Sequence, residues 1–98
     1  MKSEEKQGAA AVFRVRELLV RQRTQTINAL RGHLTEFGAV VPQGAWNARR
    51  LAELVEAEDD ALPEAARATL QVLVDGLRHL DERIAALDAE ITRRARED

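Results

Sequence analysis

A run of seven apolar residues in the last third of the chain constrains the fold most strongly. They follow one another at alternating spacings of three and four: Leu70, Leu73, Leu77, Leu80, Ile84, Leu87 and Ile91. This is the heptad pattern of a coiled coil, three heptads long, and a single helix cannot bury such a seam alone. The pattern therefore predicts a long helix over residues 63–96, with Pro63 at a favourable first position, and a helical partner for its seam.

The first third of the chain contains a second amphipathic pattern, which predicts a helix over residues 3–38. Ser3 is a suitable residue to begin this helix, and Gly38 is a suitable residue to end it. The apolar positions that we assign to its side of the seam are Phe13, Val20, Ile27, Leu30 and Leu34. Because the two long helices are equally long, their seams can cover each other along most of their length.

The segment between the two long helices breaks the helical pattern. Pro42 and Gly44 predict a loop over residues 39–45, and Leu51, Leu54 and Val55 give a short amphipathic helix over residues 46–56. We therefore expect one all-α domain over residues 1–98. Its architecture is an antiparallel helical hairpin, a coiled coil, with the short helix packed at the turn.

The apolar arc of the first helix is wider than one helical partner requires. From Val15 through Val12 to Phe13 it spans about 160° at 100° per residue. A single two-helix seam also offsets too little of the conformational entropy that about 70 ordered residues lose. We therefore expect two copies to pair into a four-helix homodimer.

Two arginines occupy positions in the first helix where the spacing favours leucine. Arg16 and Arg23 lie one heptad apart, and Asp81 and Asp88 lie one heptad apart beside the last seam. An antiparallel hairpin brings Arg23 near Asp81 and Arg16 near Asp88. These residues then form interhelical ion pairs that set register and orientation. The alternative is that the guanidinium groups reach out of the hairpin to bind phosphate.

Charge is distributed unevenly along the chain, although its net value is only −2. Residues 1–50 carry nine Lys and Arg against four Asp and Glu, whereas residues 51–98 carry six against thirteen. One interpretation is that a basic helix pairs with an acidic helix and that its outer charges are ordinary solvated surface. The other is that the first half of the chain presents a face that binds polyanions. The candidates for contacts with nucleic-acid phosphates are Arg14, Arg21, Arg23, Arg31, Arg49 and Arg50.

The sequence contains no pattern that predicts catalysis. Cysteine is absent, His79 is isolated, and His33 with Glu36 supplies only two potential metal ligands. There is no Ser–His–Asp arrangement and no glycine-rich phosphate loop, so we expect no enzyme, metal, cofactor or small-molecule substrate. No apolar run approaches the ~18 residues of a membrane span and no signal peptide is present, which predicts a soluble, cytoplasmic protein without a membrane partner.

A resemblance adds to these patterns. The segment FRVRELLVRQRTQTINALRGHLTEFGAVVPQG (residues 13–44) closely resembles the middle of bacterial insertion-sequence transposases of the DEDD type. These are recombinases with a RuvC-like domain that are guided by a bridge RNA. KSEEKQ (residues 2–7) and LPEAARATL (residues 62–70) are similar to the same family. The matching motifs are Arg14 and Arg16, residues 21–24, 27–34, 36–38 and 42–44.

The resemblance implies a fragment that lacks both catalytic domains. The family has an acidic metal site before this region and a nucleophilic serine after it, and neither motif is present. The segment between them is the family's coiled-coil module, which joins protomers and lies against guide RNA and DNA. Two alternatives remain open: a purely structural hairpin without nucleic-acid contact, and a transposase-derived regulator that acts through mixed dimers.

Overall fold

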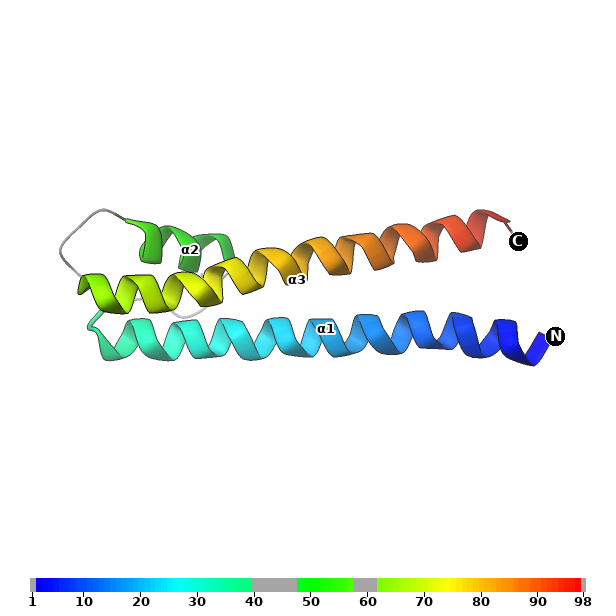
Figure 1. Ribbon diagram of the computed structural model, residues 1–98, viewed down its shortest axis with the longest axis horizontal. Coiled ribbons are helices and arrows are strands. Elements are labelled where there is room, and N and C mark those ends of the chain that lie inside the picture. Colours follow the sequence, from blue (N-terminus) through cyan, green and yellow to red (C-terminus); the bar gives the residue numbers. More distant parts are fainter. Residues whose placement is uncertain (1, 40–47, 58–61, 98) are drawn as a thin grey trace.

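The protein is a hairpin of two long antiparallel helices with a short third helix at one end. The computed structural model describes residues 2–39, 48–57 and 62–97. Helix α1 is Lys2–Glu36, α2 is Ala48–Glu56 and α3 is Glu64–Glu97. Figure 1 shows α1 and α3 side by side in opposite directions, with α2 beside the first half of α3. The predicted all-α hairpin with a short helix at the turn is confirmed.

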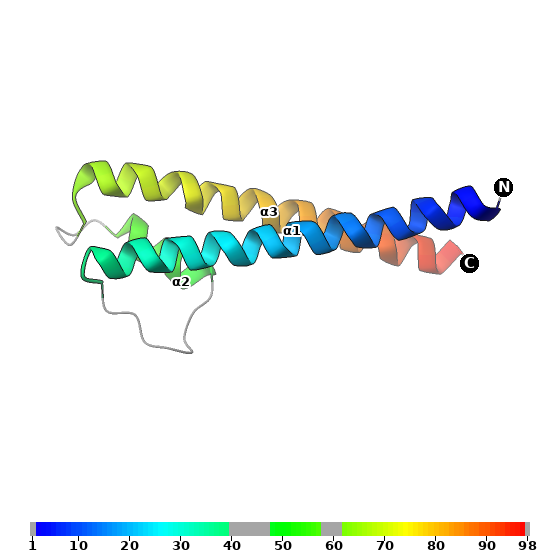
Figure 2. The ribbon, with the colours of Figure 1, turned by 90° about the horizontal axis from the view of Figure 1, so that it is seen from below.

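The two ends of the hairpin differ in construction. At the turn end α1 finishes, α3 begins and α2 packs; at the open end α1 begins and α3 finishes (Figures 1 and 2). Most of the predicted loop and the first two residues of the predicted short helix fall at 40–47, outside the described residues. Within the described residues, no helix is both long and apolar enough to cross a membrane.

Gly38 ends α1 with a left-handed residue. Its φ of 84° suits glycine, which has no Cβ to clash in this region. The Ala39 amide donates to the Leu34 carbonyl at 3.0 Å, and the Gly38 amide donates to the Thr35 carbonyl at 2.9 Å. These are the two hydrogen bonds of a Schellman motif, which satisfy carbonyls that a helix end otherwise leaves unpaired. The chain therefore leaves α1 in a defined direction.

The buried core lies where all three helices meet. Side chains from α1, α2 and α3 are almost fully enclosed there, and they form one contiguous cluster. Its members are Leu30, Leu34, Leu51, Ala52, Val55, Leu62, Leu70, Val74 and Leu77. Val74 is not part of the predicted seam, although it is more enclosed than Leu73. This difference arises because α2 covers the side of α3 on which Val74 lies.

The open end consists of two helices only, and its seam is incompletely covered. Val20 on α1 and Ile84, Leu87 and Ile91 on α3 are half-buried. Phe13, which the heptad pattern assigns to the seam, is 57% exposed. Val15 and Leu18 are also exposed, at 46% and 45%. A pair of helices has no third element to cover the flanks of its seam, so these apolar side chains remain in contact with water.

Candidate nucleic-acid and assembly interface

Two charged layers interrupt the apolar contact between α1 and α3. Arg16 Nε donates to Asp88 Oδ1 at 2.5 Å, and Arg16 Nη2 donates to Asp88 Oδ2 at 3.4 Å. Arg23 Nε donates to Asp81 Oδ1 at 2.5 Å. The four side chains retain 34–50% of their exposure, so both pairs lie at the edge of the helix contact. Hydrogen bonding to Asp88, and then its charge, raise the pKa of the Arg16 guanidinium.

The two ion pairs define one register between the helices. Seven residues forward along α1, from Arg16 to Arg23, correspond to seven residues backward along α3, from Asp88 to Asp81. A slip of one heptad would keep only one pair and place the other arginine opposite either Val74 or Ala95. Exposed ion pairs add little stability, but losing one and burying an unpaired cation is costly. The pairs therefore specify the alignment more than they strengthen it.

The remaining candidate arginines differ in their surroundings. Arg21 is two-thirds exposed and lies 3.7 Å from Glu17, which is equally exposed. Arg49 and Arg50 both approach Glu53, at 3.6 and 3.7 Å. Arg31 is half-buried and engaged, and Arg50 has a further interaction.

The last candidate, Arg14, is exposed, and the ion pairs among the described residues do not include it. Arg14 and Arg21 lie seven residues apart on the exposed side of α1, and Arg49 on α2, with 90% of its side chain exposed, is also accessible.

A second ionic network fastens α2 to α3. Arg78 donates from both terminal nitrogens to Glu56, at 2.8 and 3.0 Å, and Gln71 Nε2 donates to the same carboxylate at 3.0 Å. The hydrogen bonds from Arg78, and then from Gln71, lower the pKa of Glu56. Sequence reasoning missed this network because its members are 15 and 22 residues apart on different helices, and no periodic pattern links them.

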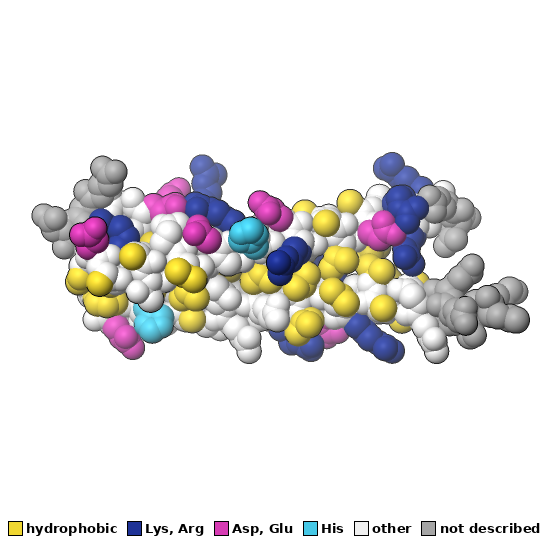
Figure 3. All heavy atoms as spheres, viewed as in Figure 1, with side chains coloured by type: hydrophobic (Ala, Val, Ile, Leu, Met, Phe, Trp, Pro, Cys, Tyr) yellow, Lys and Arg dark blue, Asp and Glu magenta, His cyan; other side chains and the backbone are white. Residues whose placement is uncertain are grey.

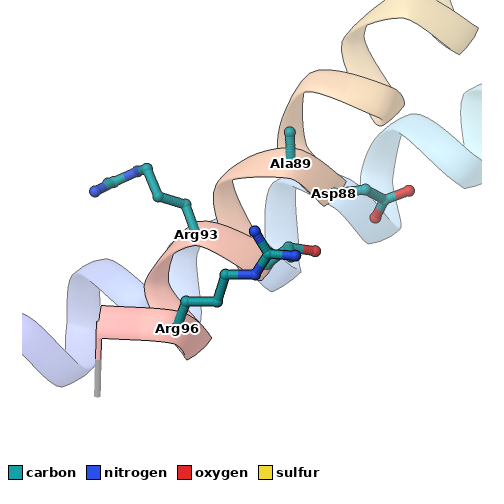
Figure 4. A pocket seen from close by; sticks show the side chains of 5 residues that line it. Asp88, Ala89, Arg93 and Arg96 are labelled. Atoms are coloured by element: carbon teal, nitrogen blue, oxygen red, sulfur yellow. The ribbon is translucent and has the colours of Figure 1, made fainter.

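The C-terminal end of α3 is rich in arginine, but its charges are mostly compensated locally. Glu90 accepts hydrogen bonds from Arg93 at 2.5 Å and Arg94 at 3.0 Å, which lower its pKa to about 2. A hollow of about 570 Å³ lies beside them, lined by Asp88, Ala89, Thr92, Arg93 and Arg96. Figure 4 shows Asp88 pointing toward α1 and Arg93 pointing away from it. Because all five lining residues come from one helix, the hollow is shallow and open.

The predicted pair of potential metal ligands is formed but is not joined by others. His33 Nδ1 lies 3.6 Å from Glu36 Oε2, one turn apart on α1, and both side chains are exposed. His79 is exposed on α3. Within the described ranges, no three histidine or carboxylate side chains are close enough together to hold a metal ion.

Comparison with known proteins finds homologues among bacterial transposases. The chain is 39% identical over 100 residues to the "Probable family 20 transposase" of Pseudomonas aeruginosa, covering 100% of this chain and 30% of that protein. It is 31% identical over 97 residues to the transposase for insertion sequence element IS1328 of Yersinia enterocolitica, covering 99% of this chain and 28% of that protein. No family model and no solved structure matches.

The homology covers 92–100% of the chain but its relatives only in part. The transposase for insertion sequence element IS1111A of Coxiella burnetii is 31% identical over 91 residues, which are 92% of this chain and 25% of that protein. Across the matches, the chain spans only 25–30% of the relatives' length. The chain is thus homologous to one portion of insertion-sequence transposases.

We predict that exchanging the charges of one layer preserves the register. Arg23→Asp places two carboxylates opposite each other and should lower the midpoint of thermal unfolding. The double variant Arg23→Asp with Asp81→Arg should recover most of that loss, because the pair is re-formed with reversed polarity. Circular dichroism melts of the three proteins measure both effects. Equal midpoints for the single and double variants would show that Arg23 and Asp81 are not coupled.

We also predict that acid weakens the attachment of α2. The folded pKa of Glu56 is below its ordinary value of 4.5, so its contribution is present above that value and lost as the pH falls through the folded pKa. Glu56→Gln should destabilise the protein at pH 7, and the difference from wild type should shrink as the solution is acidified. Urea unfolding at several pH values tests this. The matched control is Glu53→Gln on the same helix, whose partners Arg49 and Arg50 are local, and it should change stability much less.

Proposed function

We propose that this chain is the coiled-coil assembly and linker module of an insertion-sequence transposase, and that it also contacts the phosphate backbone of DNA or guide RNA. The observation that carries the proposal is the homology along the whole chain to 25–30% of each relative. A helical hairpin is suited to such a position because it presents long outer surfaces and needs no catalytic group of its own. In this proposal, catalysis belongs to other parts of the transposase.

The open end supports a role in assembly. Its two helices leave Phe13, Val15 and Leu18 substantially exposed, and the seam residues Ile84 and Leu87 are only half-buried. Val15 and Leu18 share one side of α1, whereas Phe13 lies at the other edge of its apolar arc. Neighbouring exposed apolar side chains are typical of a surface that binds another protein. A homodimer that covers Val15 and Leu18 would add to the small amount of apolar surface that a chain of 98 residues can bury alone.

The outer face of α1 supports contact with nucleic acid. Arg14 and Arg21 form a row on the exposed side of the helix, and the 3.7 Å pair between Arg21 and Glu17 is weak because both side chains are two-thirds exposed. Guanidinium groups bind phosphate oxygens well. No aromatic residue interrupts this row to stack on bases, so the contacts that we propose are with the backbone and are independent of base sequence.

One set of observations favours a scaffold without nucleic-acid contact. Arg23 is held by Asp81, and Arg49 and Arg50 both have Glu53 close by. The Arg23 guanidinium would have to exchange its carboxylate for a phosphate, whereas the carboxylate near Arg49 and Arg50, like Glu17 beside Arg21, is exposed and lies one turn away. Arg14 and Arg21, which share one face of α1, therefore provide the first test between the two functions. A regulator that acts through mixed dimers with full-length subunits would use the same assembly surface.

For assembly, we expect the chain to sediment with about twice its monomer mass of 10.9 kDa as its concentration is raised. Covering the apolar side chains of the open end drives the association. Sedimentation equilibrium at several concentrations measures the mass directly. A mass that stays at the monomer value up to the highest concentration at which the protein remains in solution would refute the assembly role.

For nucleic-acid contact, we expect the chain to bind a structured RNA or duplex DNA with an affinity that falls steeply between about 50 and 200 mM salt. The variant Arg14→Gln with Arg21→Gln should bind more weakly. The slope of its log binding constant against log salt concentration should be smaller in magnitude by about two, because two phosphate contacts are lost. Fluorescence anisotropy of a labelled probe gives both quantities. The matched control, Arg83→Gln with Arg96→Gln, removes two exposed charges from α3 and should retain the slope. Unchanged binding in the first variant would show that Arg14 and Arg21 do not make these contacts, whereas absence of binding by the wild-type chain leaves only the scaffold function.

A further inference from the structure

A stripe without formal charge runs along the exposed surface of α1. Its positions advance by three and four residues, and every one of them is exposed to solvent. None is Asp, Glu, Lys or Arg, although six charged residues lie elsewhere on the same stretch of helix. The charge-free stripe comprises Gly8, Ala11, Val15, Leu18, Gln22, Gln25, Ala29 and His33. Solvent-exposed helix faces are usually charged, so a stripe of this length is typical of a helix that meets another helix.

The charge-free stripe leads into an apolar hollow at the turn end. This hollow has a volume of about 870 Å³, and His33 belongs both to its wall and to the stripe. Phe37 lines it from α1, and the side chains from α3 are mostly small or apolar: Pro63, Ala65, Ala66, Ala68, Thr69, Leu70, Val72 and Leu73. Figure 3 shows hydrophobic side chains gathered along the groove between the two long helices.

The hollow and the stripe lie on the side of the hairpin that α2 does not cover. Helix α2 faces α3 at Val74, Leu77, Arg78 and Asp81, which line the small cavity of about 220 Å³ between the two helices. The α3 residues of the hollow, such as Thr69 and Val72, project from a different side of that helix. No described residue of the chain itself therefore covers the hollow, and a partner can approach it.

The two ends of this surface differ in shape, because only the turn end is hollowed. At the open end, Val15 and Leu18 project with 46% and 45% of their surface exposed. At the turn end, alanines and Thr69 leave the hollow, whose wall also includes the exposed side chains of Phe37 and Val72. If two copies lie antiparallel across a two-fold axis, Val15 and Leu18 of each copy enter the hollow of the other. A parallel pair would place large side chains against large ones and leave both hollows unfilled, which loses packing contacts.

We propose that the charge-free stripe and the hollow form the contact between two copies of this chain, and that the copies are antiparallel. This inference rests on the assembly role proposed above and assigns the partner, the face and the orientation. Such a contact is isologous, so each complementary fit occurs twice. It would be about 45 Å long at 1.5 Å per residue and two helices wide, which gives roughly 800 Å² per partner, the size of a standard interface.

Charge placed on this face tests which surface is used. Leu18→Glu and Thr69→Glu each bury a carboxylate at one end of the proposed contact, and each should weaken dimerisation at least tenfold in sedimentation equilibrium. Ala89→Glu is the matched control, because Ala89 is an exposed small residue of α3 outside the stripe and the hollow. It should dimerise as wild type does. Circular dichroism of all three variants must retain the helical spectrum, which separates loss of the contact from loss of the fold.

Cross-linking tests the orientation. The chain has no cysteine, so Leu18→Cys and Thr69→Cys each introduce a single thiol. When the two variants are mixed and oxidised, an antiparallel dimer should give mainly the mixed disulfide between positions 18 and 69, identified by mass spectrometry of tryptic peptides. Disulfides joining 18 to 18 and 69 to 69 would instead show a parallel dimer and overturn the orientation.

The outcomes separate this inference from the assembly role on which it rests. A wild-type chain that stays monomeric refutes the assembly role itself. A wild-type dimer that persists in both Leu18→Glu and Thr69→Glu supports assembly but overturns the proposed face. Loss of dimerisation in these two variants, retention in Ala89→Glu, and the mixed disulfide together establish the proposed contact.

Discussion

Burial of apolar side chains between α1 and α3 is the constraint on which the rest of the structure depends. Neither helix can enclose its own seam, and the contact between them is complete only where α2 adds a third wall around Leu30, Leu34 and Val74. The burial of apolar side chains therefore decreases along the hairpin, from a closed core at the turn end to a half-covered pair of helices at the open end. The enclosed turn end and the accessible open end belong to the same pair of continuous helices.

This decrease in burial explains why arginines are tolerated at two positions of the seam. A fully enclosed layer cannot hold a guanidinium group and a carboxylate without a large desolvation cost. Arg16 lies toward the open end and Arg23 near the middle of the hairpin, and their pairs with Asp88 and Asp81 keep a third to a half of their exposure. At these positions, the ion pairs can select one register among the several that a heptad repeat allows. The proposed function uses the same helix differently, because Arg14 and Arg21 on its outer side face solvent.

Local and periodic features of the sequence predicted most of the fold. The ladder from Leu70 to Ile91 requires a helical partner, and equal spacing of the two arginines and the two aspartates is compatible with an antiparallel pair. The enclosure of Val74 and the contact of Glu56 with Arg78 were not predicted. Both depend on the side of α3 that α2 covers, and spacing within a helix contains no information about that. The signal present was the combination of Leu70, Leu73, Val74 and Leu77, an arc wider than two helices need.

The start of α1 and the finish of α3 lie together at the open end, whereas the turn lies at the far tip of a molecule 59 Å long (Figure 1). In a longer homologue, the backbone would enter and leave such a hairpin at neighbouring points. The hairpin would then protrude from the longer protein and would hardly change the distance between the segments that flank it. A molecule bound near the turn end would be held several nanometres from the point of attachment, so the length of the hairpin would set the distance between that molecule and the rest of the protein.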